Sequence, residues 1–119
     1  MTQAIAKTHA VLWVDHHQAT VLWLDVHPAP ARHLKAHSHP TGQHGSEVRA
    51  QHEFFGELCD SLHSVDAVLA TGSKTALIDL RHYVDKHRAH LAPKIVAYDI
   101  VDHLTDNQLA AHGRQYFEL

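Results

Sequence analysis

The stretch Thr8-His-Ala-Val-Leu-Trp-Val-Asp15, followed after two residues by Gln18-Ala-Thr-Val-Leu-Trp-Leu-Asp25, decides how the fold begins. Both segments are rich in β-branched and aromatic residues, a composition typical of strands. Because only His16 and His17 separate them, the connection has room for nothing longer than a tight turn. We therefore expect two strands that pair as an antiparallel hairpin.

A third strand is predicted over residues 31–37, after Pro28 and Pro30 interrupt the strand pattern. Side chains alternate between the two faces of a strand, so this segment has two unlike faces. One face would carry Arg32, Leu34 and Ala36, and the other His33, Lys35 and His37. Residues 38–46, which contain Pro40, Gly42 and Gly45, are predicted to form an exposed loop.

The second half of the chain alternates between helical and strand patterns. Ser46 is suited to cap a helix that ends near His63, and Thr105 with Gln108 forms a capping box for a last helix. Strands are predicted over 65–71 and 94–101, with a helix between them that follows Gly72-Ser73-Lys74 and a connection that ends at Pro93. The residues expected on the apolar helix faces are Val48, Phe55, Leu58, Cys59, Leu62, Leu77, Leu80, Tyr83, Val84, Leu109, Tyr116 and Phe117.

The resulting order, βββαβαβα, predicts an α/β fold. Strands joined through a helix normally run parallel, so the later strands should join the initial hairpin and third strand in a mixed sheet. This is the ribonuclease-H-like arrangement. We expect a flexible N-terminus over residues 1–7 and a single domain over residues 8–119, a length at which one core suffices.

Composition narrows the class of protein further. A single cysteine excludes a disulfide framework, and neither a signal peptide nor an apolar run long enough to cross a bilayer is present. We therefore expect a soluble cytoplasmic protein that does not contact a membrane. The net charge of −3 with neutral histidines does not favour strong non-specific binding to nucleic acid, but the 15 histidines can add local positive charge when they are protonated.

Five short stretches in a fixed order resemble the middle domain of the archaeal and eukaryotic-type peptide release factors and of their relative Pelota. The resemblance extends from about Thr8 to Phe117, and small bacterial proteins of this standalone type are described as translational machinery proteins. The stretches are Ala10-Val-Leu-Trp-Val-Asp15, Thr41-Gly-Gln-His-Gly-Ser46, His52-Glu-Phe-Phe55, Leu69-Ala-Thr-Gly-Ser-Lys74 and Lys94-Ile-Val-Ala-Tyr-Asp99.

This resemblance implies a role on the ribosome. In the release factors, a Gly-Gly-Gln tip between the third strand and the first helix enters the peptidyl-transferase centre and promotes hydrolysis of peptidyl-tRNA. Here the matching residues are Thr41, Gly42 and Gln43, and a β-branched residue cannot adopt every conformation open to glycine. The tip is therefore not intact, which favours a ribosome-rescue, stalling or hibernation role over termination. Docking would be supplied by the domain itself or by a protein partner that provides the missing domains.

The candidate surface for RNA or ribosome contact is the segment around the predicted loop. Cations on a strand face that leads into a loop can contact phosphates. The same histidines suggest an alternative, a metal-binding protein or small metal-dependent hydrolase that holds zinc or nickel through His33, His37, His39 and His44. The RNA-contact candidates are Arg32, His33, Lys35, His37, His39, Thr41, Gly42, Gln43, His44 and Arg49.

Other chemistry finds less support. Gly72, Ser73 and Lys74 would form an anion-binding turn at a helix N-terminus, without the spacing of a P-loop. A two-metal nuclease would use Asp15 and Asp25, which the hairpin separates. Cys59 lies on an apolar helix face and is a poor nucleophile. The sequence thus favours a non-catalytic module that needs no cofactor and leaves an enzymatic role open.

Overall fold

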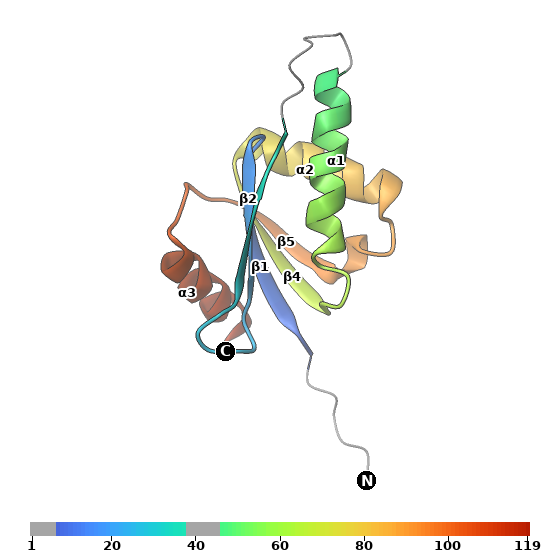
Figure 1. Cartoon of the computed structure of the whole chain (residues 1–119). Coiled ribbons are helices and arrows are strands. Elements are labelled where there is room, and N and C mark those ends of the chain that lie inside the picture. Colours follow the sequence, from blue (N-terminus) through green and yellow to red (C-terminus); the bar gives the residue numbers. More distant parts are fainter. Residues whose placement is uncertain (1–6, 38–45) are drawn as a thin grey trace.

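The computed structural model of the chain describes residues 7–37 and 46–119. Its elements follow the predicted order (Figure 1). The strands are β1 (His9–Val14), β2 (Gln18–Trp23), β3 (Ala31–Lys35), β4 (Ala67–Gly72) and β5 (Ile95–Ile100). The helices are α1 (Ser46–Asp60), α2 (Lys74–His87) and α3 (Asp106–Phe117), with a short 3₁₀ turn, η1 (Ala92–Lys94), before β5.

The five strands form one mixed sheet in the order β3-β2-β1-β4-β5. β1 pairs antiparallel with β2, and β2 with β3, whereas β1–β4 and β4–β5 are parallel. Asp15 fixes the hairpin turn, because its Oδ1 accepts hydrogen bonds from the backbone N–H groups of His17 (2.7 Å) and Gln18 (2.8 Å). The ribonuclease-H-like α/β fold and the predicted hairpin are confirmed.

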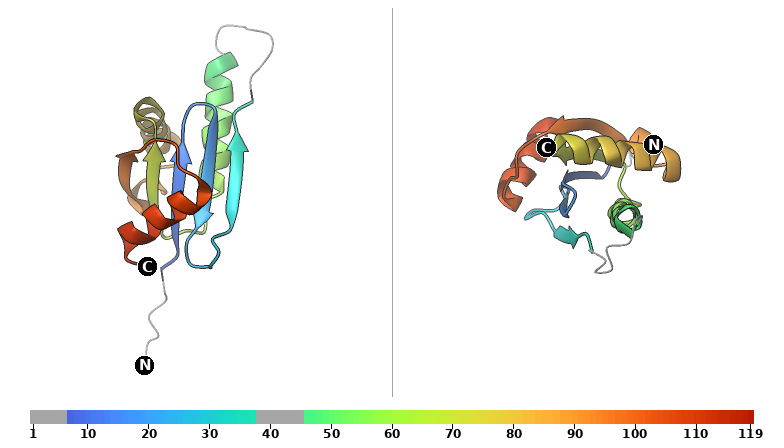
Figure 2. Two further views of the ribbon diagram at one scale, coloured as in Figure 1. Left: turned by 90° about the vertical axis from the view of Figure 1, so that its left-hand side faces the viewer. Right: turned by 90° about the horizontal axis from the view of Figure 1, so that it is seen from above.

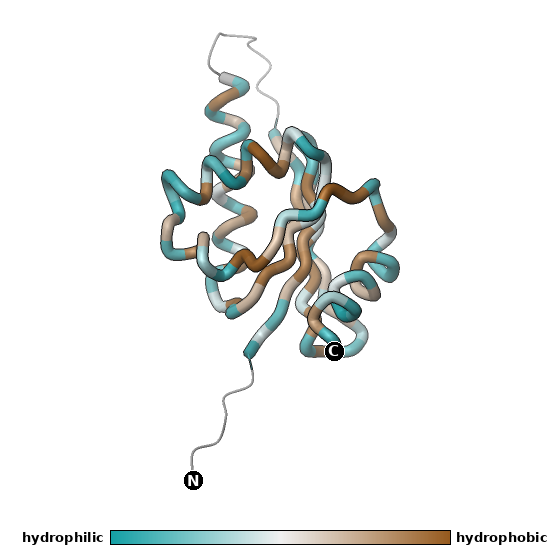
Figure 3. Tube along the Cα trace, turned by 180° about the vertical axis from the view of Figure 1, so that it is seen from behind, coloured by the Kyte–Doolittle hydropathy of each residue, from teal (hydrophilic) through white to brown (hydrophobic). Residues whose placement is uncertain are grey.

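The sheet separates two hydrophobic cores. α1 and α2 pack on one face around residues such as Leu12, Val21 and Leu58, and α3 packs on the opposite face around Val11 and Leu109. Figure 2 shows α3 and α1 on opposite sides of the strands. The hydropathy trace is brown through much of the sheet and alternates along the helices, as expected for strands covered on both faces (Figure 3).

Two residues expected on apolar helix faces, Val48 and Tyr116, are exposed instead. The side chain of Val48 is 60% exposed, because the first turns of α1 extend past the ends of the strands (Figure 1). Tyr116 near the end of α3 is also exposed, whereas Leu109 is buried. Phe54, which was not assigned to the core, is buried beside Phe55.

Candidate nucleic-acid interface

The third strand positions the candidate interface at the edge of the sheet. β3 pairs with β2 alone, so its other side is an edge, where charged residues are common because they oppose pairing with another chain. Leu34 is buried against the α1 and α2 core, so the neighbouring residues His33 and Lys35 must face the other way. The predicted division of this strand into two faces is confirmed.

The two faces of β3 contact different helices. The guanidinium of Arg32 donates a hydrogen bond from Nη1 to Oγ of Ser61, 2.7 Å away, just beyond α1. On the opposite face, Nε2 of His33 lies 2.8 Å from Oδ2 of Asp106 at the start of α3. Both side chains of this second pair are about half exposed or more, at 60% and 46%. Arg32 is therefore separated from the His33 face by the strand itself.

Lys35 lies on the same side of the strand as His33, and His37 comes two residues after the strand ends; both are exposed. Arg49 is exposed as well but lies on α1, together with His52 on the same helix. The sheet edge thus groups His33, Lys35 and His37, and the structure does not join Arg32 or Arg49 to their face. The remaining predicted contacts, His39, Thr41, Gly42, Gln43 and His44, lie outside the described residues.

The metal alternative draws on the same region. Of its four histidines, only His33 and His37 are described, and His33 is already paired with Asp106. Within residues 7–37 and 46–119, no three His, Cys, Asp or Glu side chains gather in a metal-binding arrangement. A zinc or nickel site that includes His39 and His44 stays a prediction.

The turn at residues 72–74 has an evident structural role. Gly72 ends β4 with a φ of 150°, and a Cβ there would lie 2.0 Å from the carbonyl oxygen of Val14. The backbone N–H of Ser73 donates to that same oxygen (3.1 Å), and the carbonyl of Gly72 accepts from Val101 (3.0 Å). These groups hold β1, β4 and the start of α2 together. Lys74 is exposed at the helix N-terminus, and an anion-binding role there stays a prediction.

The groups considered for catalysis all have structural explanations. Burial raises the pKa of the Cys59 thiol to about 12, so the thiolate needed for attack is scarce at neutral pH. Asp15 caps the hairpin turn, whereas Asp25 accepts hydrogen bonds from His9 at the opposite end of the hairpin. Two carboxylates at opposite ends of paired strands cannot share a metal pair.

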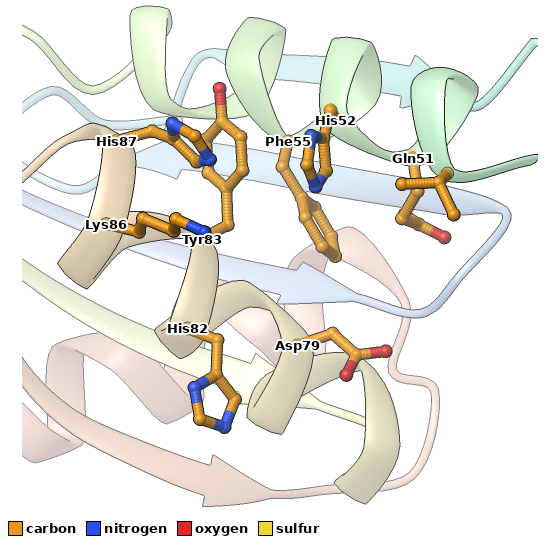
Figure 4. A pocket seen from close by; sticks show the side chains of 9 residues that line it. Gln51, His52, Phe55, Asp79, His82, Tyr83, Lys86 and His87 are labelled. Carbon is orange, nitrogen blue, oxygen red and sulfur yellow. The ribbon is translucent and has the colours of Figure 1, made fainter. Parts of the chain in front are cut away.

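One grouping of polar residues is absent from the sequence-based expectations. A cavity of about 320 Å³ lies between α1 and α2, and His52, Tyr83, Lys86 and His87 contribute to its wall (Figure 4). The helical periodicity of each segment places these residues near one side of their helices, but only the packing of α1 against α2 brings them together.

The fold is shared with solved translation factors. The chain is similar to Pelota from Archaeoglobus fulgidus (TM-score 0.56, 14% identity), covering 93% of this chain and 35% of that one. It is also similar to Pelota from Thermoplasma acidophilum, with a TM-score of 0.56 and 14% identity over 92% of this chain and 32% of that one. An archaeal translation termination factor matches with a TM-score of 0.54 and 13% identity over 93% of this chain and 39% of that one.

These likenesses concern the fold, and the chain spans between 32% and 39% of the length of the three matched structures. A scan against protein-family models and a search of curated proteins found no match. None of the helices in the described part of the chain combines the length and apolar composition that crossing a bilayer requires. The expected ribonuclease-H-like fold is the arrangement that this chain adopts.

Proposed function

We propose that this chain is a ribosome- or RNA-associated module in translation, of the rescue, stalling or hibernation type. The observation that supports it most is the likeness, over 92–93% of the chain, to two Pelota proteins and a translation termination factor. The sheet edge adds a surface of suitable chemistry, because His33 and Lys35 share one side of β3 and the exposed His37 follows shortly after the strand. Residues 38–45, where the resemblance places the tip, follow directly from this edge.

The proposal is tested by co-sedimentation of the protein with purified ribosomes at several salt concentrations. We expect the protein to sediment with ribosomes and to be released as salt increases, because phosphate contacts are weakened by competing cations. The double variant Lys35→Ala/His37→Ala should bind at least several-fold more weakly. A matched control, Lys7→Ala/His63→Ala, removes the same residue types from exposed positions elsewhere and should bind normally. Equal binding by all three proteins would exclude the β3 edge as the contact surface.

The pH dependence separates RNA contact from the metal alternative. Protonated imidazoles add positive charge, so ribosome binding should strengthen between about pH 7.5 and pH 6. Protons compete with metals for imidazole nitrogens, so a zinc or nickel site would lose its metal over the same interval. Metal analysis before and after chelation, in the same preparations, decides between the two.

We also expect no peptide release. Thr41 replaces the first glycine of the tip that the resemblance implies, so incubation with ribosomes that carry peptidyl-tRNA should give hydrolysis no faster than buffer. Release well above the buffer rate that is lost in Gln43→Ala would overturn this part of the proposal.

A further inference from the structure

The cavity between α1 and α2 has a wall made of aromatic rings. The centroids of Tyr83 and His87 are 4.9 Å apart, and the His52 ring lies 5.4 Å from each of them. Phe55, 5.8 Å from Tyr83, extends the cluster towards the core. A flat ligand stacked between two rings needs about 7 Å between the ring planes, and the rings of this cluster are closer together than that. The ligand would therefore lie against the outer face of the cluster.

Lys86 is the cation that an anion in the cavity would contact. His52, His82 and His87 also line the cavity, and Asp79 is the one acidic side chain in this lining. Oδ2 of Asp79 lies 2.8 Å from Nε2 of His16, a residue of the β1–β2 turn. The Asp79 carboxylate therefore already has a side-chain partner. Figure 4 shows the Lys86 side chain beside Tyr83, with Asp79 and His82 lower in the view, away from His52.

Tyr83 adds no negative charge to the wall. Burial raises the pKa of its phenol, which is therefore neutral at physiological pH. The guanidinium of Arg88 lies 5.8 Å from the centroid of the same ring, a distance at which a cation is attracted to an aromatic face. Arg88, which is outside the cavity lining, thus contacts the Tyr83 ring, while the neighbouring His52 and His87 side chains are exposed to solvent.

Two further residues of the lining lack the contacts expected of them. Val48 exposes an apolar side chain at the rim. The buried amide nitrogen of Gln51 has no hydrogen-bond partner among the described residues. Buried amide donors normally have a partner, so this nitrogen is an exception within the described residues, but it has almost no accessible surface through which a bound molecule could reach it.

We propose that this cavity binds one nucleotide, with the base against the exposed His52 ring and the half-buried Tyr83 ring and the phosphate near Lys86. Rings and a neighbouring cation match a flat base that carries a phosphate. A volume of about 320 Å³ lies at the lower end of the range for ligand pockets, which suits one nucleotide better than two. The nucleotide is either free or an unpaired residue of single-stranded RNA. The site does not depend on the proposed ribosomal role, because the sheet separates it from the His33 face of β3.

Calorimetric titration of the purified chain with adenosine 5′-monophosphate tests the site without ribosomes. We expect saturable binding of one equivalent, with adenosine and inorganic phosphate each binding more weakly. Lys86→Ala should weaken binding of the monophosphate about ten-fold and affect adenosine much less, because adenosine has no phosphate for the ammonium group to contact. His52→Ala should weaken both. Lys7→Ala, which removes an exposed lysine outside the cavity lining, is the matched control and should bind like the unaltered chain.

The two sources of the nucleotide are distinguished by a second titration with single-stranded hexa-adenylate. Tighter binding of the hexamer than of the monophosphate, with the same losses in Lys86→Ala and His52→Ala, assigns the site to RNA. Equal or weaker binding assigns it to a free nucleotide. The proposal is overturned if the monophosphate and the hexamer do not bind at millimolar concentration, or if neither variant changes their affinity while circular dichroism shows both variants folded. Failure of ribosome binding would leave these results unaffected.

Discussion

At the scale of single residues, Gly72 shows how closely the backbone of one strand approaches another. The carbonyl of Val14 in β1 lies where a side chain at position 72 would begin, and it also accepts the hydrogen bond from Ser73. β1 therefore cannot move aside without losing contact with the start of α2. In addition, a φ of 150° is one that residues with a side chain rarely adopt.

We expect Gly72→Ala to lower the free energy of unfolding by roughly 3 kcal/mol or more, measured by chemical denaturation. Gly56→Ala is the matched control. A Cβ at position 56 would meet the Tyr83 hydroxyl at 3.2 Å, the end of a side chain that can shift, and alanine has the higher helix propensity. Its effect should stay within about 1 kcal/mol. Equal stability of the two variants would contradict the role given to Gly72.

Asp25 links the start of β1 to the residues after β2. Its Oδ2 accepts a hydrogen bond from the backbone N–H of His9 at 2.6 Å, and its Oδ1 lies 3.0 Å from the ring Nδ1 of the same residue. Burial opposes ionisation, but the hydrogen bonds from the His9 side chain and backbone outweigh it and leave the pKa of Asp25 below its usual value. A carboxyl with a lowered pKa in the folded chain stabilises the fold above its unfolded pKa.

This stabilisation should disappear in acid. Asp25→Asn should be less stable than the unaltered chain at pH 6, by no more than about 1 kcal/mol because the carboxylate side chain is 36% exposed. The difference should narrow as pH falls through the folded pKa of Asp25, where the unaltered chain loses the charge as well. Urea denaturation at pH 6 and at pH 2.5 measures both differences. A difference independent of pH would show that the charge of Asp25 does not contribute.

At the scale of secondary-structure elements, the sequence predicted every strand and helix in order, because periodicity and capping residues are local signals. Val48 marks the limit of such signals. Helical spacing shows that it shares a face with Phe55, but not that α1 extends past the sheet at that turn. What a helix face contacts is decided by where the other elements end.

Of the candidate sites, the one on a single strand could be predicted from the sequence, whereas the one between two helices could not. Alternation along β3 was enough to predict that His33 and Lys35 share a face. The cavity between α1 and α2 was not predicted, because His52 and His87 are far apart in the chain and approach each other only when both helices pack on the same face of the sheet. No residue spacing within either helix carries that information.

The start of α3 offers a test of a local signal that proved correct. The Thr105 side chain accepts from the backbone N–H of Gln108 at 3.2 Å, and Oε1 of Gln108 accepts from the backbone N–H of Thr105 at 3.0 Å. Thr105→Ala should therefore cost about 1 kcal/mol of stability in chemical denaturation. Thr75→Ala, an exposed threonine within α2, is the control and should change stability by less than about 0.5 kcal/mol. A larger loss in the control would argue against the capping box.

At the scale of the whole molecule, one sheet serves both cores. β1 contributes Leu12 and Val14 to the core under α1 and α2, and it contributes Val11 and Trp13 to the core under α3. Loss of either helical layer would expose one face of the same central strands. The two cores should therefore unfold together, although they lie on opposite faces of the sheet.

The two tryptophans make this cooperativity measurable. Trp13 is buried on the α3 side, where its Nε1 donates to the carbonyl of Val101 at 3.1 Å, and Trp23 packs against the core on the α1 and α2 side. In Trp23→Phe the remaining tryptophan, Trp13, reports on the core under α3. In Trp13→Phe the remaining Trp23 reports on the core under α1 and α2. Within each variant, we expect the fluorescence and far-ultraviolet circular dichroism midpoints in urea to coincide.

Adding Leu109→Ala to each single-tryptophan variant extends the test. This change leaves a cavity under α3 and should cost about 2–5 kcal/mol. If the molecule unfolds as one unit, the fluorescence midpoint of Trp23 must fall together with that of Trp13, even though Trp23 lies across the sheet from the cavity. A fall confined to Trp13 would mean that α3 and its core detach while the rest of the sheet stays folded.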